Sequence, residues 1–259
     1  MLSLSEITPF YPENLKGFHR FILREYLQHK ILEIIFNGPH ADKLCFIGGT
    51  CLRIVHNQQR FSEDLDFDNF DLSEKEFLAI AKHIEIELTR EGYQVECKEV
   101  IRGAFHCYVR FPKLLFNEGL SGYEEEKILI QLDTESQGYS FRPQRYILNK
   151  FDVFTQIFIA PESLLLAQKF YAVLNRKRNK GRDFYDIVYL LGKGIKPDYE
   201  FLTQKVGIEN GDMLKSKILS VCNAISMKEM AEDVAPFLFQ PTDAKKVELF
   251  VVYLEQVEF

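Results

Sequence analysis

A double glycine directly after a short apolar stretch is the feature that most restricts how this chain can fold. Residues 44–47 are all apolar, and Gly48, Gly49 and Thr50 follow them. The apolar stretch predicts a short buried strand, and the glycines permit a tight turn whose backbone can approach a bound group closely. Thr50 is placed to cap a helix over residues 50–56, which would direct free N–H groups at an anion. The segment therefore predicts a phosphate-binding turn.

An aspartate pair follows this turn. Fifteen residues separate Gly49 from Asp64, and Asp66 stands two residues further on, between Leu65 and Phe67. On a strand with this alternation, both carboxylates project from one face while the apolar side chains enter the core. Such hard oxygen ligands suit Mg²⁺ (or Mn²⁺) together with substrate phosphates. Either motif alone is more often an ordinary turn or a solvated strand face, whereas their combination indicates metal-dependent nucleotidyl transfer.

A third carboxylate stands at the end of a later apolar stretch. Residues 127–132 alternate in character, and Asp133 closes the stretch. The pattern predicts a central strand whose last residue is exposed at one edge. Two metal ions that clamp the attacking and leaving oxygens of an in-line displacement need a further ligand, and Asp133 is the candidate. A turn residue at a strand end is the alternative interpretation.

Composition and charge limit the architecture and the partners. The chain has 259 residues, 46% of them hydrophobic, which supports one continuous core or two closely packed lobes. Its formal net charge is −6. This charge argues against broad nonspecific coating of nucleic acid, but it permits a local basic site.

Several classes of protein are disfavoured by the distribution of reactive side chains. The five cysteines are scattered and lack Cys-x-x-Cys spacing, which argues against a disulfide framework or a zinc site. The six histidines do not cluster, and no hydrolase triad is evident. Without a basic N-terminal segment leading into an apolar run, and without an apolar run of membrane-spanning length, we expect a cytoplasmic protein with no membrane partner.

The order of elements predicts a mixed α/β (α+β) core followed by a helical lobe. Helices are expected over residues 15–36 and 73–91, and strands over 93–101, 105–111 and 153–159. Ser73 and Glu76 form the capping box of the second helix, and Gly92 marks its end. From Pro161 onward helical patterns dominate, so we expect the core over residues 1–155 and the helical lobe over residues 156–259.

Positive charge gathers in the expected helical lobe. Between residues 161 and 196 eight Lys and Arg stand against three Asp and Glu. A basic run between helices is usually a solvated loop, which is the simplest interpretation of Lys177 and Lys180. Lys169 differs because it lies within an otherwise apolar helical segment. There it is either a lysine that extends its ammonium to solvent or a phosphate contact.

These motifs together resemble the AbiEii/AbiGii-type nucleotidyltransferases, the toxin components of abortive-infection and toxin–antitoxin systems. The resemblance covers most of the chain. The residues that carry it are Gly48-Gly49-Thr50-x-Leu52-Arg53, Arg60-Phe61-Ser62-Glu63-Asp64-Leu65-Asp66-Phe67, Leu166-Ala167-x-Lys169 with Arg176, and Arg182-Asp183-x-x-Asp186. The resemblance implies a DNA polymerase β-like nucleotidyltransferase core and a helical lobe, with the nucleotide between them.

The resemblance also implies roles for individual residues. Asp64, Asp66, Lys169 and Asp183 would be catalytic, with Lys169 neutralising phosphate charge and Asp183 positioning or activating the acceptor. The nucleotide-binding set would be Gly48, Gly49, Thr50, Arg53, Ser62 and Lys169, the metal ligands Asp64, Asp66 and Asp133, and the acceptor contacts Arg176 and Arg182. As a first-turn residue, Asp183 can alternatively cap its helix or pair with Arg182.

The implied reaction is attack of an acceptor hydroxyl on the α-phosphate of a nucleoside triphosphate, with pyrophosphate leaving. Some family members modify the 3′ acceptor end of tRNA, so tRNA or another RNA is the expected acceptor, and a cognate antitoxin is an expected partner. A transferase acting on a small molecule such as an aminoglycoside is one alternative, and a non-catalytic nucleotide-binding module is another. RNA predicts a contiguous basic surface beside the aspartates, whereas a small acceptor predicts an enclosed acidic cleft.

Overall fold

The computed structural model describes residues 2–259, and its contacts divide the chain into two compact units. The first unit comprises the chain up to His56 together with Phe61–Ile159, and the second comprises Asn57–Arg60 together with Ala160–Phe259. The boundary expected between residues 155 and 156 falls inside strand β7 (Val153–Ile159), so the compact units divide four residues later. The sequence pattern does not predict that residues 57–60 belong to the second unit.

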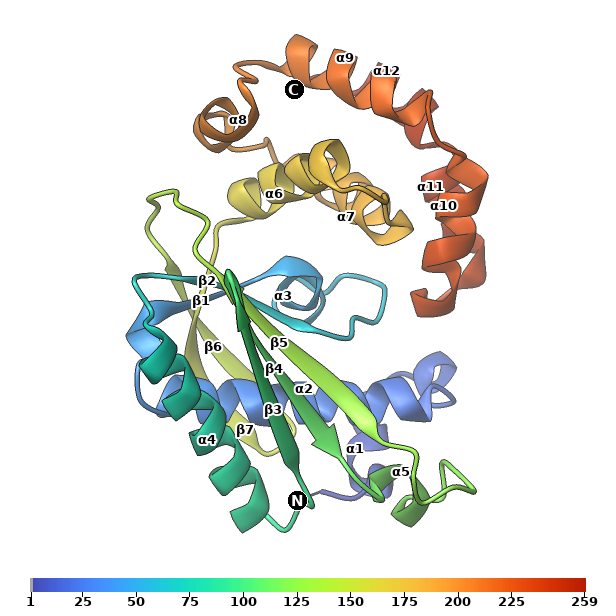
Figure 1. Ribbon diagram of the computed structural model, residues 1–259. Coiled ribbons are helices and arrows are strands. Elements are labelled where there is room, and N and C mark those ends of the chain that lie inside the picture. Colours follow the sequence, from blue (N-terminus) through green and yellow to red (C-terminus); the bar gives the residue numbers. More distant parts are fainter. Residues whose placement is uncertain (1) are drawn as a thin grey trace. The chain divides into compact units, whose positions relative to one another are not determined.

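Within residues 2–259, seven strands form one mixed sheet in the first unit (Figure 1). They are β1 Leu44–Ile47, β2 Leu65–Asn69, β3 Glu96–Arg102, β4 Ala104–Phe111, β5 Ile128–Glu135, β6 Gln144–Lys150 and β7 Val153–Ile159. Their order is β3-β4-β5-β2-β1-β7-β6. The β2–β5 and β1–β7 pairs are parallel, and the other neighbouring pairs are antiparallel.

The alternation of side chains decides which strand faces are buried. In β5, Ile128, Ile130 and Leu132 are all buried, and the strand lies between β4 and β2, which confirms the predicted central strand. The prediction that Asp133 ends this strand is wrong, because pairing with β2 continues through Glu135. Asp133 therefore lies within the sheet and has a paired neighbour on each side.

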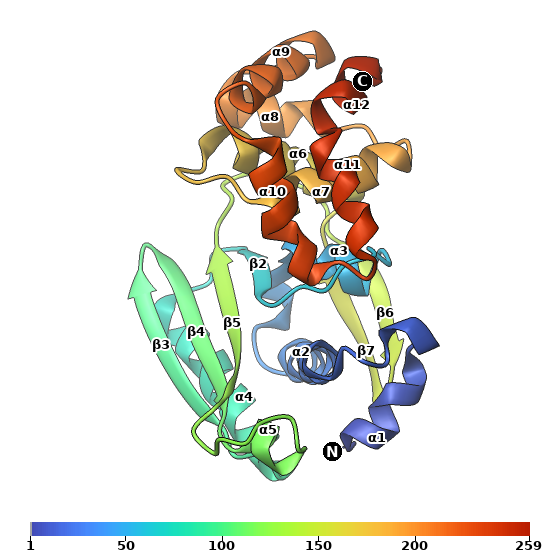
Figure 2. The same ribbon diagram turned by 90° about the vertical axis from the view of Figure 1, so that its right-hand side faces the viewer.

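The helices of the first unit are α1 Leu4–Ile7, α2 His19–Asn37, α3 Gly48–Ile54, α4 Glu74–Arg90 and α5 Leu114–Asn117. Figure 2 shows α2 nearly end-on, with β3–β5 on one side of it and β6 and β7 on the other. The capping box of Ser73 and Glu76 is confirmed, and Gly92 follows α4 with φ +96°. Thirteen of the 19 residues of α2 are buried, which makes this helix a main part of the core.

The predicted turn after β1 is confirmed, although its helix begins earlier than expected. Gly48 has φ +77°, a conformation that glycine adopts without strain. Helix α3 starts at Gly48, so Thr50 is its third residue and not its cap. The predicted cap is wrong because the glycines enter the first helical turn themselves.

The second unit is helical, as predicted. Its helices are α6 Glu162–Asn175, α7 Gly181–Gly192, α8 Tyr199–Val206, α9 Gly211–Cys222, α10 Met227–Val234, α11 Lys245–Glu248 and α12 Phe250–Gln256. Helix α7 packs against α6 and α10, and α6 also contacts α8 and α9. Gly181 permits the close approach of α7 and α10, because a side chain there would overlap the carbonyl oxygen of Met230. None of the helices in residues 2–259 combines the length and apolar character needed to cross a bilayer.

A buried carboxylate joins three elements of the first unit. Glu25 of α2 is 3% exposed, and its carboxylate contacts Arg53 Nε at 2.7 Å and Lys150 Nζ at 2.8 Å. The hydroxyl of Tyr11 donates to the same group at 2.8 Å. Burial alone would raise the pKa of Glu25, but Arg53 and Lys150 outweigh it and lower the pKa to about 2. Glu25 therefore holds α3 and β6 to α2.

We expect Glu25→Gln to lower the free energy of unfolding by about 3 kcal/mol at pH 7, since it leaves two partly buried cations without their counter-charge. The folded-state pKa of Glu25 lies below its ordinary value of 4.5. Its stabilisation is therefore complete above that value and is lost as the pH falls toward about 2. Urea unfolding of both proteins between pH 7 and pH 3 checks this.

The control is Glu13→Gln, which removes an exposed carboxylate paired with Lys16 on the surface. This control should change stability by less than about 1 kcal/mol at every pH. A deficit of Glu25→Gln that is as large at pH 3 as at pH 7 would contradict the assigned role of the Glu25 charge.

Candidate functional site

Two of the predicted carboxylates lie side by side in the sheet of the first unit. Strands β2 and β5 run parallel, and Asp66 is in register with Asp133. Asp64 stands immediately before β2, two residues from Asp66. On its other side Asp66 pairs with Ile47, the last residue before the glycine turn. The sheet thus brings the aspartate pair, the third carboxylate and the turn to one place.

Gly48 approaches the carboxylate of Asp66 so closely that no side chain fits between them. A Cβ atom at Gly48 would overlap the Asp66 carboxylate, and the φ of +77° independently excludes most other residues. The Thr50 hydroxyl donates to the backbone oxygen of Asp64. Gly48 and Thr50 therefore bind the start of α3 to the residues that precede and open β2.

Asp133 is oriented by two neighbouring side chains that sequence reasoning did not identify. The Nδ1 atom of His106 lies 2.6 Å from Asp133 Oδ1, and Gln131 Nε2 donates to both carboxylate oxygens at 2.8 and 3.0 Å. His106 is opposite Asp133 in the β4–β5 ladder. Only this register reveals the pair, because 27 residues separate the two in sequence.

The structure gives Arg53 and Ser62 contacts other than the predicted one. The Arg53 guanidinium is paired with Glu25 and lies over the Phe61 ring, 5.9 Å from the ring centroid. The backbone oxygen of Ser62 accepts a hydrogen bond from Gln28 Nε2 at 3.1 Å. Contact of either side chain with a triphosphate stays a prediction.

The residues around Asp66 fit a magnesium ion that shares its ligands with a substrate. Across residues 2–259 no group of three or more His, Cys, Asp or Glu side chains is arranged to hold a metal by itself. Mg²⁺, however, is usually held by one or two carboxylates together with waters and substrate phosphates. Asp64 and Asp66, two residues apart at the start of β2, supply oxygens of this kind.

The second unit contains a buried ion network around Asp186. Arg60 Nη2 lies 2.7 Å from Asp186 Oδ2, and Lys169 Nζ approaches the same oxygen at 2.7 Å. Gln58 Nε2 donates to Asp186 Oδ1 at 2.6 Å. The side chains of Arg60 and Asp186 are 1% and 0% exposed. Burial alone would raise the pKa of Asp186, but Arg60 and Lys169 outweigh it and hold the pKa below its usual value.

Asp183 belongs to the same network, one helical turn before Asp186. Lys169 Nζ lies 3.0 Å from Asp183 Oδ1, and Arg176 Nη1 lies 3.2 Å from Asp183 Oδ2. The partners that the structure gives Asp183 are therefore Lys169 and Arg176, whereas the Arg182 guanidinium lies 4.6 Å from the centroid of the Phe237 ring. Sequence reasoning assigned no role to Arg60 or Asp186, although both stand within the motifs that carry the family resemblance.

We expect Arg60→Met and Asp186→Asn each to lower the free energy of unfolding by about 3–5 kcal/mol, because each leaves a buried charge without its partner. The double variant should lose less than the sum of the two, since both members of the pair are then gone. Urea unfolding of the wild type, the two single variants and the double variant gives this double-mutant cycle.

Lys193→Met is the matched control, because Lys193 pairs with Glu162 at the surface of the same unit. It should cost at most about 1 kcal/mol. Additive losses in the cycle, or a loss from Arg60→Met no larger than that of the control, would refute the role given to the Arg60–Asp186 pair.

Comparison with known proteins agrees with this geometry. The family model described as nucleotidyl transferase AbiEii toxin, type IV TA system, matches residues 30–249. Two solved structures from Helicobacter pylori share the fold. JHP933 is 16% identical, with 92% of each chain covered and a TM-score of 0.55. A protein described as a nucleotidyltransferase is 18% identical, with 90% of this chain and 97% of its own covered and a TM-score of 0.51.

None of the curated proteins matches the sequence. At these identities the two structures establish the fold, which is the predicted nucleotidyltransferase-like architecture of a mixed sheet with a helical C-terminal region. The family match extends over most of the sequence. The chain therefore belongs to the AbiEii family of nucleotidyltransferase toxins of type IV toxin–antitoxin systems.

Proposed function

We propose that this nucleotidyltransferase transfers a nucleoside monophosphate from a nucleoside triphosphate to a hydroxyl group of RNA, with tRNA as the expected acceptor. Family membership itself implies the triphosphate substrate and a cognate antitoxin. The observation that carries the proposal is the parallel register of Asp66 and Asp133, with the Gly48 turn against Asp66. This arrangement combines oxygen ligands with a backbone turn that a phosphate can approach.

Asp64 and Asp66 would hold the magnesium or manganese ion, with Asp133 as the further ligand. When bound, the ion would neutralise charge on the transferred phosphoryl group. The chain itself fixes the position of these ligands. Thr50 binds the backbone before β2, while His106 and Gln131 hold Asp133 in one orientation.

Lys169 and Asp183 are proposed to take part as the family resemblance implies. A lysine ammonium has three N–H donors, and Asp183 and Asp186 take two of them, so among the described residues one donor is left for a phosphate oxygen. Both carboxylate oxygens of Asp183 face a cation. This favours positioning of the acceptor by Asp183 over removal of its proton. Arg176 pairs with Asp183, but its side chain is 48% exposed and can also contact an RNA backbone. Arg182 is proposed to make a second contact of this kind.

An RNA acceptor is supported by exposed positive charge on the second unit. Arg176, Lys177 and Arg178 are exposed in the connection between α6 and α7. Basic side chains presented in this way bind phosphates without regard to sequence. A small acceptor would instead favour an enclosed acidic cleft.

The decisive experiment incubates the purified protein with total tRNA, Mg²⁺ and each α-labelled nucleoside triphosphate in turn. We expect label on RNA from the wild type, and at least a hundredfold less from Asp64→Asn and Asp66→Asn, because each removes charge at the developing transition state. Thermal unfolding of the variants confirms that the fold is retained. Asp212→Asn, which changes an exposed aspartate of α9 outside the carboxylate group, is the control.

Triphosphate binding without label on RNA would reject the RNA acceptor and favour a small molecule. Equal labelling by wild type and Asp66→Asn would reject the assigned role of Asp66.

A second prediction isolates the contact between Gly48 and Asp66. Gly48 and Gly103 both have φ +77°, but a Cβ atom at Gly103 would meet nothing within 4 Å. Gly48→Ala and Gly103→Ala therefore share the same backbone strain of about 1–2 kcal/mol, and they differ in the displacement of Asp66. We expect Gly103→Ala to keep its transferase activity, while Gly48→Ala loses at least tenfold in kcat. Similar activity of the two variants would show that the close approach at Asp66 is unimportant.

A further inference from the structure

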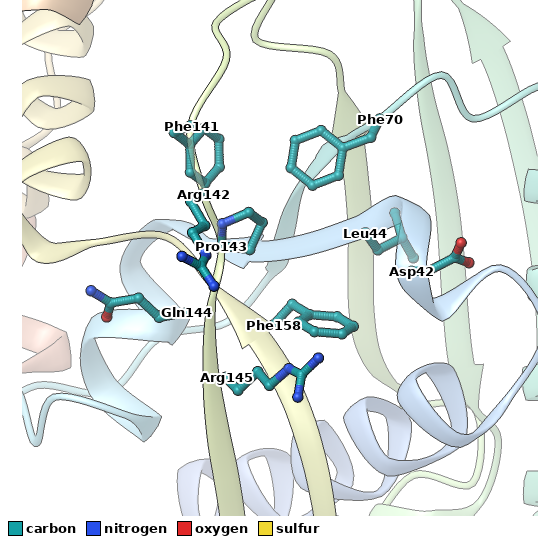
Figure 3. Close-up of a pocket in the computed structure, with 9 residues that line it drawn as sticks. All are labelled: Asp42, Leu44, Phe70, Phe141, Arg142, Pro143, Gln144, Arg145 and Phe158. Atoms are coloured by element: carbon teal, nitrogen blue, oxygen red, sulfur yellow. The ribbon is translucent and has the colours of Figure 1, made fainter.

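A pocket of about 920 Å³ lies in the first unit, apart from the carboxylates described above. The loop that joins β5 to β6, the start of β1, the residue after β2 and the end of β7 contribute its lining. Figure 3 shows the rings of Phe70, Phe141 and Phe158 around this space, together with the guanidinium groups of Arg142 and Arg145. Its volume is within the range of about 300–1,000 Å³ that is typical of ligand sites.

The apolar part of the lining includes three aromatic rings that are incompletely buried. Phe70 and Phe141 are in contact, with ring centroids 5.7 Å apart and planes inclined by 60°. Tyr139 stacks behind Phe141 at 6.5 Å, with an interplanar angle of 17°. Such rings offer flat faces on which a nucleobase of any sequence can stack.

The polar part of the lining is positively charged. Arg142 and Arg145 are exposed, and within residues 2–259 neither forms an ion pair. Arg145 is opposite Phe158 in the β6–β7 ladder, so the two side chains lie on the same face of the sheet. The lining contains two arginines and a single carboxylate, Asp42, in a chain with a net charge of −6. Arginine forks in this setting suit phosphate oxygens.

The pocket is close to the aspartates along the sheet. Leu44 lines the pocket at one end of β1, and Ile47, at the other end, is in register with Asp66. Three residues of extended strand span about 10 Å. A stacked nucleic acid strand covers that distance in about three nucleotides, at ~3.4 Å each.

We propose that this pocket binds one nucleobase and an adjacent phosphate of a single-stranded RNA segment a few nucleotides from the reacting hydroxyl. The base stacks against Phe141, and Arg142 and Arg145 hold the phosphate. The inference rests on the proposed RNA acceptor and assigns to it a binding site separate from the catalytic aspartates. The site is tolerant of base identity, because its contacts are stacking and charge.

The test measures binding of a fluorescein-labelled, single-stranded RNA decamer to the full-length protein by anisotropy, without nucleoside triphosphate. Phe141→Ala and the double variant Arg142→Ala/Arg145→Ala should each weaken binding about tenfold. The arginine variant should also reduce the dependence of binding on salt, whereas Phe141→Ala should leave it unchanged.

Matched controls come from the same sheet. Phe154 of β7 is 69% exposed, and Arg102 ends β3, both outside the pocket lining. Phe154→Ala and Arg102→Ala should bind the decamer like the wild type. If the pocket variants bind the decamer as tightly as these controls, the pocket assignment is overturned.

The tRNA-labelling assay separates failure of the pocket from failure of the acceptor. If the wild type labels RNA and the pocket variants bind and label it equally well, the pocket assignment is overturned and the RNA acceptor stays in place. If the wild type neither binds nor labels RNA, the pocket assignment and the RNA acceptor are both overturned.

Titration with AMP and with UMP distinguishes a strand from a free nucleotide. Under this proposal each mononucleotide binds at least tenfold more weakly than the decamer. Equal affinity that Phe141→Ala abolishes would identify a mononucleotide site and overturn the RNA assignment.

Discussion

Neutralisation of one buried carboxylate is the constraint on which each unit depends. In the first unit Glu25 is surrounded by Arg53, Lys150 and Tyr11, and in the second Asp186 is surrounded by Arg60, Lys169 and Gln58. A buried charge is costly unless cations and hydrogen bonds surround it, so each carboxylate fixes the elements that bring its partners. These elements include α3, which carries the glycine turn, and α7, which carries Asp183. Charge pairing in the core therefore determines where the candidate functional groups stand.

Local patterns predicted much of the fold because their causes are local. The glycine turn, the capping box of Ser73, the alternation in β5 and the helical C-terminal region each depend on residues close in sequence, and the structure confirms all four. The two predictions that were wrong, the Thr50 cap and the end of β5, also have identifiable causes. Gly48 enters the helix that Thr50 was expected to cap, and pairing with β2 extends β5 beyond Asp133.

The rest of the candidate site depends on register and on distant pairing, which one sequence does not reveal. His106 meets Asp133 only because β4 and β5 pair at one particular offset, and Arg60 meets Asp186 across 126 residues. Arg53 illustrates the converse. A basic residue near a phosphate-binding turn suggests a ligand contact, whereas the folded chain gives it Glu25 as a partner.

Because of the tetrapeptide 57–60, neither unit is encoded by one continuous stretch of the sequence. The chain leaves the first unit after His56, contributes Gln58 and Arg60 to the second, and returns at Phe61 to form β2. A fragment that begins at Ala160 would lack the guanidinium that neutralises Asp186, and recombination at that point would exchange a helical lobe without its counter-ion. Compatible changes on both sides of the boundary must therefore be inherited together, so the two units are expected to evolve as a single block.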